Sequence, residues 1–165
     1  MVLHMTLAVS AEPYDSHDAR ALVAALDAHL SERYLPAQRF GPNLRQEETE
    51  SGRGVFLVAR VEGRPVGCGA LRVLGGGDAE VKRMWVDPAV RGQGVAKAVL
   101  ARLQDEALEL GATRLVLETG IHQTEAIGLY RSSGFERVEC WGEYAGVPTS
   151  FCMAKSIGSA SCPTP

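Results

Sequence analysis

Val86-Asp87-Pro88-Ala89-Val90-Arg91-Gly92-Gln93-Gly94-Val95-Ala96-Lys97 is the stretch of this chain that predicts most about its fold. The residues before it, Glu80–Val86, favour a β-strand, and the proline and glycines then indicate a tight turn. After the turn, apolar residues recur at helical spacing: Val95, Val99, Leu100, Leu103, Ala107 and Leu108. The turn therefore lies at a helix N-terminus, where free N–H groups attract an anion and Gly92 and Gly94 let a phosphate approach the backbone.

Two common phosphate-binding motifs do not fit this turn. A dinucleotide-binding Rossmann motif needs a third small residue and an opening βαβ unit, whereas this turn lies in mid-chain. A P-loop closes with Lys-Ser or Lys-Thr, whereas Lys97 is followed by Ala98. A strand-to-helix connection that binds no ligand is the remaining alternative, because Gly-x-Gly turns are common.

Two motifs make the chain similar to the GNAT superfamily of N-acetyltransferases over nearly its whole length. Arg91-x-x-Gly94-x-Ala96 matches the superfamily's pyrophosphate-binding signature, Arg/Gln-x-x-Gly-x-Gly/Ala. Leu115–Gly120 followed by Gln123–Phe135 resembles its second hallmark, a strand and then a helix that carries Ala-Ile-x-Leu-Tyr and ends in Gly-Phe. The resemblance implies an α/β (α+β) fold, with residues 1–155 forming one domain in which helices flank a mixed, mostly antiparallel sheet of about six or seven strands.

The composition agrees with one enzyme domain and argues against other classes. The chain has 165 residues, of which 45% are hydrophobic and 22% charged. Its net charge of −3 does not favour nucleic acid as a partner, and no apolar stretch is long enough to span a bilayer. Four widely spaced cysteines follow no signal peptide, so we expect a reduced, cytoplasmic protein in which Cys68, Cys140 and Cys152 pack as small apolar side chains.

The rest of the sequence predicts elements in an order that suits this superfamily. A strand over Thr6–Ser10 precedes a helix that begins at Asp15 or Ser16 and contains Ala21, Leu22, Ala25, Leu26 and Leu30 on its apolar face. Leu35–Arg53 predicts a loop with at most one short helix. Two hairpins are expected, Val55–Val61 with Val66–Val73 and Phe135–Trp141 with Ser150–Ala154. Residues 156–165 predict a disordered tail.

The resemblance also implies how acetyl-CoA, the donor, binds. The backbone N–H groups of Gln93, Gly94, Val95, Ala96 and Lys97 bind the pyrophosphate, with a positive charge from Arg91 and space from Gly92. Met84 and Val86 pair through their backbone with the pantetheine arm, as an added strand does, while their side chains pack in the core. Many relatives place an Asn seven residues before the tyrosine to bond the pantetheine, whereas this chain has Gln123, whose amide lies one carbon further out.

Tyr130 and Glu80 are the residues that we expect to move protons. Tyr130 matches the family's tyrosine that protonates the departing thiolate. Without the surrounding Ala-Ile-x-Leu-Tyr and Gly-Phe motif, it would be interpreted as a core residue. Glu80 occupies the strand position from which many members activate a water or the amine with a carboxylate. The alternative for Glu80 is an exposed carboxylate paired with Lys82 or Arg83.

These residues together predict direct transfer of an acetyl group to a primary amine of a small molecule in a ternary complex. We expect neither a metal nor a covalent cysteine intermediate, and Glu118 and His122 stay open as alternative bases. A catalytically silent acyl-CoA sensor or partner subunit, a protein-amine acetyltransferase and a plain nucleotide-binding module are the alternative functions. The apolar residues in Val138–Trp141 and Ser150–Met153 favour a homodimer.

Overall fold

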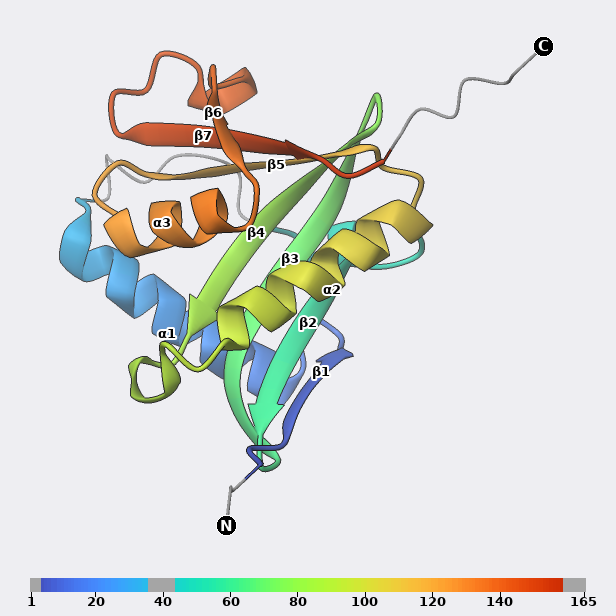
Figure 1. The fold of residues 1–165 in the computed structure, drawn as a ribbon, viewed down its shortest axis with the longest axis vertical. Coiled ribbons are helices and arrows are strands. Elements are labelled where there is room, and N and C mark those ends of the chain that lie inside the picture. Colours follow the sequence, from blue (N-terminus) through green and yellow to red (C-terminus); the bar gives the residue numbers. More distant parts are fainter. Residues whose placement is uncertain (1–3, 36–43, 159–165) are drawn as a thin grey trace.

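A single sheet organises the part of the chain that the computed structural model describes, residues 4–35 and 44–158 (Figure 1). Within these residues the sheet has seven strands: β1 (Leu7–Ala11), β2 (Gly54–Val61), β3 (Arg64–Gly75), β4 (Asp78–Val86), β5 (Arg114–Gly120), β6 (Glu136–Val138) and β7 (Ser150–Ser156). Their order is β1-β2-β3-β4-β5-β7-β6, and every neighbouring pair is antiparallel except β4 and β5. The predicted mixed, mostly antiparallel sheet is confirmed.

The described helices cover opposite faces of this sheet (Figure 1). They are α1 (His17–Arg33), α2 (Val95–Glu109) and α3 (Thr124–Ser132), with short 3-10 turns η2 (Gln46–Thr49), η3 (Pro88–Val90) and η4 (Gly142–Tyr144). Side chains alternate along a strand, so Phe56 and Val58 of β2 pack with Leu22 of α1, whereas Leu57 packs with Leu103 of α2. Two apolar layers therefore enclose the sheet.

Most local predictions are confirmed, with small shifts. Ser16 caps α1, since its Oγ accepts a hydrogen bond from the Ala19 N–H at 3.2 Å. Ala21 is exposed on α1, and Leu108 is 41% exposed on α2, so both were wrongly placed on the apolar faces. The Leu35–Arg53 prediction lies partly outside the described residues, and its described part contains η2.

The first three residues of the predicted tail, 156–158, are not disordered. Ser156 belongs to β7, and the N–H groups of Ile157 and Gly158 donate to the carbonyl of Thr113. Ile157 also packs against the core beneath α2, which explains why the chain stays attached past the strand. The rest of the predicted tail, 159–165, lies outside the described residues.

A second correction concerns the cysteines. Cys140 and Cys152 form a disulfide, with their Cα atoms 5.2 Å apart, so the expectations that they are reduced and that they pack as free apolar side chains were both wrong. The pairing of β6 with β7 brings them together, because Val138, two residues before Cys140, lies opposite Cys152. Cys68 on β3 is a free, buried thiol, as expected, and burial raises its pKa to about 12.

The feature of the sheet that positions the site is the separation of β4 from β5. The two strands share only three residue pairs, from Asp78–Arg114 to Glu80–Val116. Beyond them β4 bulges: its register with β3 shifts, and Arg83 has a positive φ of 56°. The strands then diverge, and their pairing ends after Glu80–Val116 (Figure 1).

Candidate active site

One cavity of about 860 Å³ brings nearly all the predicted site residues together. It is lined by Glu80, Met84, Val86, Arg91, Gly92, Gly94, Val95, Ala96, Lys97, Gln123 and Tyr130. Gln93 is exposed and does not line it. The size is that of a small-molecule or cofactor site. The cavity touches both β4 and β5 where they diverge, so it joins the α2 side of the sheet to the α1 side.

The glycine turn forms one end of the cavity. Gly92 and Gly94 have positive φ values of 79° and 84°, and a Cβ on either would meet nothing in the described residues within 4 Å. Gly94 is the N-cap of α2 and offers no side-chain acceptor, so the first N–H groups of the helix are available to a ligand. Arg91 stands beside them, since its Nε donates to the Val86 carbonyl at 3.0 Å and its guanidinium lies 5.0 Å from the centre of the Trp85 ring. The turn has the shape of an anion site.

Gln123 supplies a hydrogen-bond donor that needs a partner. Its Nε2 is buried, and no described residue accepts a hydrogen bond from it. A buried amide donor without an acceptor is costly, and the residue lines the cavity. A ligand with an amide carbonyl would satisfy it.

Tyr130 lies on α3 and lines the same cavity as the glycine turn. Its side chain is 5% exposed and packs edge-to-face on Phe135. Burial, and then the charge of Glu118, raise its pKa above the usual value. The hydroxyl therefore stays protonated and can act as a donor.

Glu80 lies on β4, and both oxygens of its carboxylate accept hydrogen bonds. Its Oε2 accepts hydrogen bonds from Nε and Nη2 of Arg72 at 2.9 and 2.8 Å. Its Oε1 accepts one from the Tyr144 hydroxyl at 2.8 Å, with Lys82 Nζ at 3.6 Å. The side chain is 1% exposed, which rules out the alternative of an exposed strand carboxylate.

Glu118, near the end of β5, lines the cavity as Glu80 does, together with Asp27 and Glu125. Its Oε1 accepts a hydrogen bond from Ser150 Oγ at 3.0 Å. Burial raises its pKa, although Ser150 and the charge of Lys82 oppose that shift. His122 is exposed and does not line the cavity.

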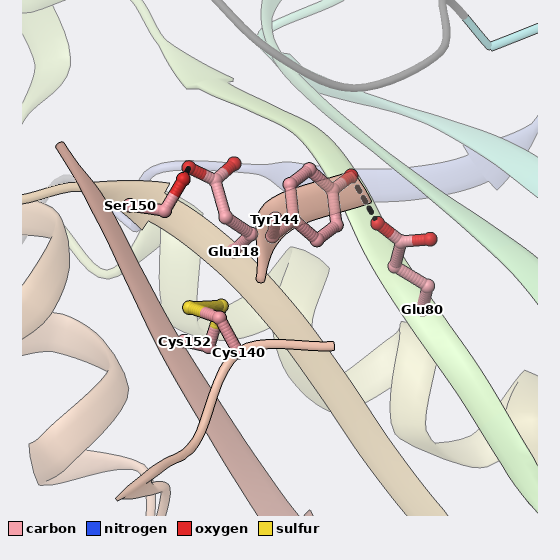
Figure 2. Close-up of a disulfide and its surroundings, with 6 residues drawn as sticks. All are labelled: Glu80, Glu118, Cys140, Tyr144, Ser150 and Cys152. Carbon is pink, nitrogen blue, oxygen red and sulfur yellow. Dashed lines mark hydrogen bonds between the residues drawn. A yellow bond between two sulfur atoms is a disulfide. The ribbon is translucent and has the colours of Figure 1, made fainter. Parts of the chain in front are cut away.

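Three residues of this end were not predicted from the sequence: Arg72, Tyr144 and Tyr34. Tyr144 sits between the two carboxylates and bonds Glu80 (Figure 2). Tyr34 follows α1 and packs so closely on Gly120 that a Cβ there would collide with its hydroxyl. In the sequence, only the glycine at position 120 hints at such a close contact. Arg72 and Tyr144 could not be found in this way, because their partners come from other parts of the chain.

The geometry agrees with what is known of similar proteins. The model of the acetyltransferase (GNAT) family matches residues 20–135. This chain belongs to the GNAT acetyltransferase family. An IAA acetyltransferase from Azospirillum brasilense is 40% identical to this GNAT protein over 138 residues, which cover 82% of this chain and 88% of that one.

Solved structures agree with this assignment. A Klebsiella pneumoniae protein whose proposed activity is acyl-CoA N-acyl transfer matches this GNAT fold with a TM-score of 0.79 and 31% identity, over 93% of this chain and 99% of that one. The PaiA N-acetyltransferase of Thermoplasma acidophilum, solved with coenzyme A, matches with a TM-score of 0.70 over 92% of this chain and 99% of that one, but its 14% identity bears on the fold alone. The chain is thus an acyltransferase of a family that uses acetyl-CoA.

The described residues of this GNAT domain fit coenzyme A. The open glycine turn suits the pyrophosphate, and the Gln123 amide suits an amide of the pantetheine arm. Among the described residues, no three His, Cys, Asp or Glu side chains are grouped so that they could hold a metal ion. In the same ranges, no helix is both long and apolar enough to cross a membrane.

Proposed function

We propose that the protein transfers the acetyl group of acetyl-CoA to a primary amine of a small molecule, by direct attack in a ternary complex. The observation that carries this proposal is that one cavity is lined by the glycine turn, by Tyr130 and by the carboxylates Glu80 and Glu118. Donor and acceptor can therefore meet where β4 and β5 diverge, each entering from its own side of the sheet.

The donor lies along the residues that the family motifs mark. The pyrophosphate binds the backbone N–H groups from Gln93 to Lys97, with Arg91 adding positive charge. The pantetheine arm pairs with the backbone of Met84 and Val86 and takes a hydrogen bond from Gln123. These contacts direct the thioester toward Tyr130.

The reaction moves two protons. A neutral amine attacks the thioester carbonyl carbon, the C–S bond breaks, and Tyr130 donates its proton to the departing thiolate. The amine loses one proton to a carboxylate at the acceptor end, where the sequence points to Glu80 and the cavity also presents Glu118.

A small acceptor is favoured over a protein tail by the walls of the acceptor end. The tyrosines Tyr34 and Tyr144 line it and are 6% and 4% exposed, so they narrow the space beside the carboxylates. A silent sensor is disfavoured because the chain keeps both a buried tyrosine donor and two cavity carboxylates. We place the protein in the cytoplasm, where acetyl-CoA is available, and propose that it works as a homodimer.

Calorimetry with acetyl-CoA tests the donor site. Gly94→Val puts a branched side chain into the open space of the turn and strains a left-handed residue by about 1–2 kcal/mol, so we expect acetyl-CoA affinity to fall more than about tenfold. Gly111→Val is the matched control, because Gly111 has the same φ of 84° and open surroundings at the other end of α2. Lys97→Ala should change the affinity for acetyl-CoA little if only the backbone of Lys97 binds the pyrophosphate.

An unchanged affinity in Gly94→Val, or an equal loss in Gly111→Val, would contradict the donor site. Release of the coenzyme A thiol with a panel of primary amines then tests transfer itself. Binding of acetyl-CoA without thiol release for any amine would favour the sensor.

A further inference from the structure

We infer that Glu118, and not Glu80, takes the proton from the acceptor amine, and that Ser150 is the positioning residue that holds the Glu118 carboxylate. The inference rests on the proposed function and names the base for it. Figure 2 shows the arrangement: Ser150, Glu118, Tyr144 and Glu80 follow one another from β7 across to β4.

The two carboxylates differ in what their oxygen atoms already bind. Both oxygens of Glu80 accept hydrogen bonds, from the Arg72 guanidinium and from the Tyr144 hydroxyl. A carboxylate that is 1% exposed and bound in this way has little room for a substrate proton, and protonation would leave the half-buried Arg72 with Glu48 as its remaining carboxylate partner. Glu80 therefore serves to hold Arg72 and Tyr144 in place.

The carboxylate of Glu118 has one oxygen that accepts no hydrogen bond from the described residues. Ser150 Oγ donates to its Oε1, and no residue in the described ranges donates to its Oε2. Glu118 lies just beyond the last β4–β5 pair, where the strands have separated, and lines the same cavity as Tyr130. Proton donor and proton acceptor thus lie at the one place where thioester and amine can meet.

The surroundings of Glu118 make its carboxylate more basic than usual. Burial raises its pKa, Ser150 and Lys82 lower it, and Glu80 raises it. Five titratable groups interact electrostatically with Glu118. They are Glu80 and Lys82 of β4, Tyr34 after α1, Tyr130 of α3 and Tyr144 of η4.

The step balances. The N–C bond forms as the C–S bond breaks; Glu118 gains the proton that the amine nitrogen loses, and the thiolate gains the proton of Tyr130. The base must start ionised, so the rate falls as pH drops through the pKa of Glu118 and is restored above it.

Glu118→Gln is the first test, with Glu136→Gln as the matched control. Glu136 is an exposed carboxylate on β6 that does not line the cavity. For an amine found in a panel of the standard amino acids, tyramine and tryptamine, we expect Glu118→Gln to lower kcat about 100-fold at pH 7 while acetyl-CoA affinity stays unchanged. If no panel amine reacts, slow hydrolysis of acetyl-CoA, with water as the acceptor, is the reaction measured.

The pH profile distinguishes a base from a structural residue. Wild-type kcat/KM should have an acid limb that Glu118→Gln lacks. Ser150→Ala removes a hydrogen bond that favours the ionised form, so it should raise the pKa of Glu118 and move that limb to higher pH. A merely structural role for Ser150 would lower the rate at every pH alike.

Glu80→Gln separates the two carboxylates. We expect it to lower the melting temperature, because it weakens the Arg72 pair, while the acid limb persists in the folded protein. An acid limb lost in Glu80→Gln and kept in Glu118→Gln would overturn the inference. A wild-type protein that does not bind acetyl-CoA would instead refute the proposed function, so the two failures are distinguishable.

Discussion

Tyr130 shows how burial can prepare one side chain for its task. The ring packs on Phe135, the residue lines the cavity, and its buried surroundings disfavour a phenolate. A tyrosine in that state is protonated at neutral pH and can donate its proton. Its function then depends on the basicity of the thiolate that forms in front of it.

The prediction at this scale is that Tyr130→Phe lowers kcat by about 100-fold and leaves acetyl-CoA affinity within about twofold. The substitution keeps the ring and its packing and removes only the donor. Steady-state rates of thiol release and calorimetry measure the two quantities. Tyr14→Phe is the control, because Tyr14 packs on Phe56 away from the cavity. Wild-type turnover in Tyr130→Phe would make Tyr130 a packing residue.

Sequence reasoning located the site residues that lie within short motifs. Tyr130, Gln123 and the glycine turn could be predicted because each motif is local, and its geometry follows from one turn and one helix. The hydrogen bond from Tyr144 to Glu80 joins residues 64 positions apart, and the one from Ser150 to Glu118 joins residues 32 apart. Contacts of this kind depend on how strands pair, which no local pattern determines.

At the scale of elements, the segment from β6 through η4 to β7 supports the acceptor end. It carries Tyr144 and Ser150, which bond Glu80 and Glu118, and the Cys140–Cys152 disulfide closes it at its base (Figure 2). The bridge joins cysteines 12 positions apart, so it limits how far η4 can move from the carboxylates.

We predict that reducing this bridge lowers the free energy of unfolding by up to about 3 kcal/mol, because a closed loop of this size restricts the unfolded chain. Urea unfolding with and without dithiothreitol measures the effect. The Cys140→Ser, Cys152→Ser double variant should resemble the reduced wild type and should not respond to dithiothreitol. A wild type equally stable in both states would show that the bridge does not constrain the segment.

The same segment shows where element prediction fails. A hairpin was expected there and is present, but β6 is only Glu136–Val138. The chain leaves the sheet after Val138 to place Trp141 edge-on against Tyr144, an aromatic contact that the strand pattern did not reveal. The helices were predicted better, because caps such as Ser16 and the apolar spacing of α2 are properties of the chain itself.

For the whole molecule, the burial of β7 weakens one argument for the proposed homodimer, and the edge position of β6 supplies another. Phe151, Cys152 and Met153, which were expected to be covered by a partner, are buried at 7%, 1% and 0% exposure within one chain. The sheet order, however, leaves β6 as an edge strand whose outer side pairs with no described strand. The backbone N–H and C=O groups of this edge could pair with a strand of a second copy.

We therefore predict a particle of about twice the 17.7 kDa chain mass in light scattering at micromolar concentration. Dilution should shift the mass toward that of the single chain if the edge contact is weak. A single-chain mass at every concentration would remove the dimer and leave the acceptor end to the residues of one chain.

The separation of β4 from β5 links the lifetime of the folded protein to its donor. On the proposed binding mode, the pantetheine arm takes the place of the missing ladder beside Met84 and Val86, so the chain without donor is a sheet with a gap at its centre. A ligand present at 100 times its dissociation constant adds about 2.7 kcal/mol to the stability of the folded state. The abundance of this protein in a cell would then follow the supply of acetyl-CoA, because molecules that lack their donor open more often and meet proteases first.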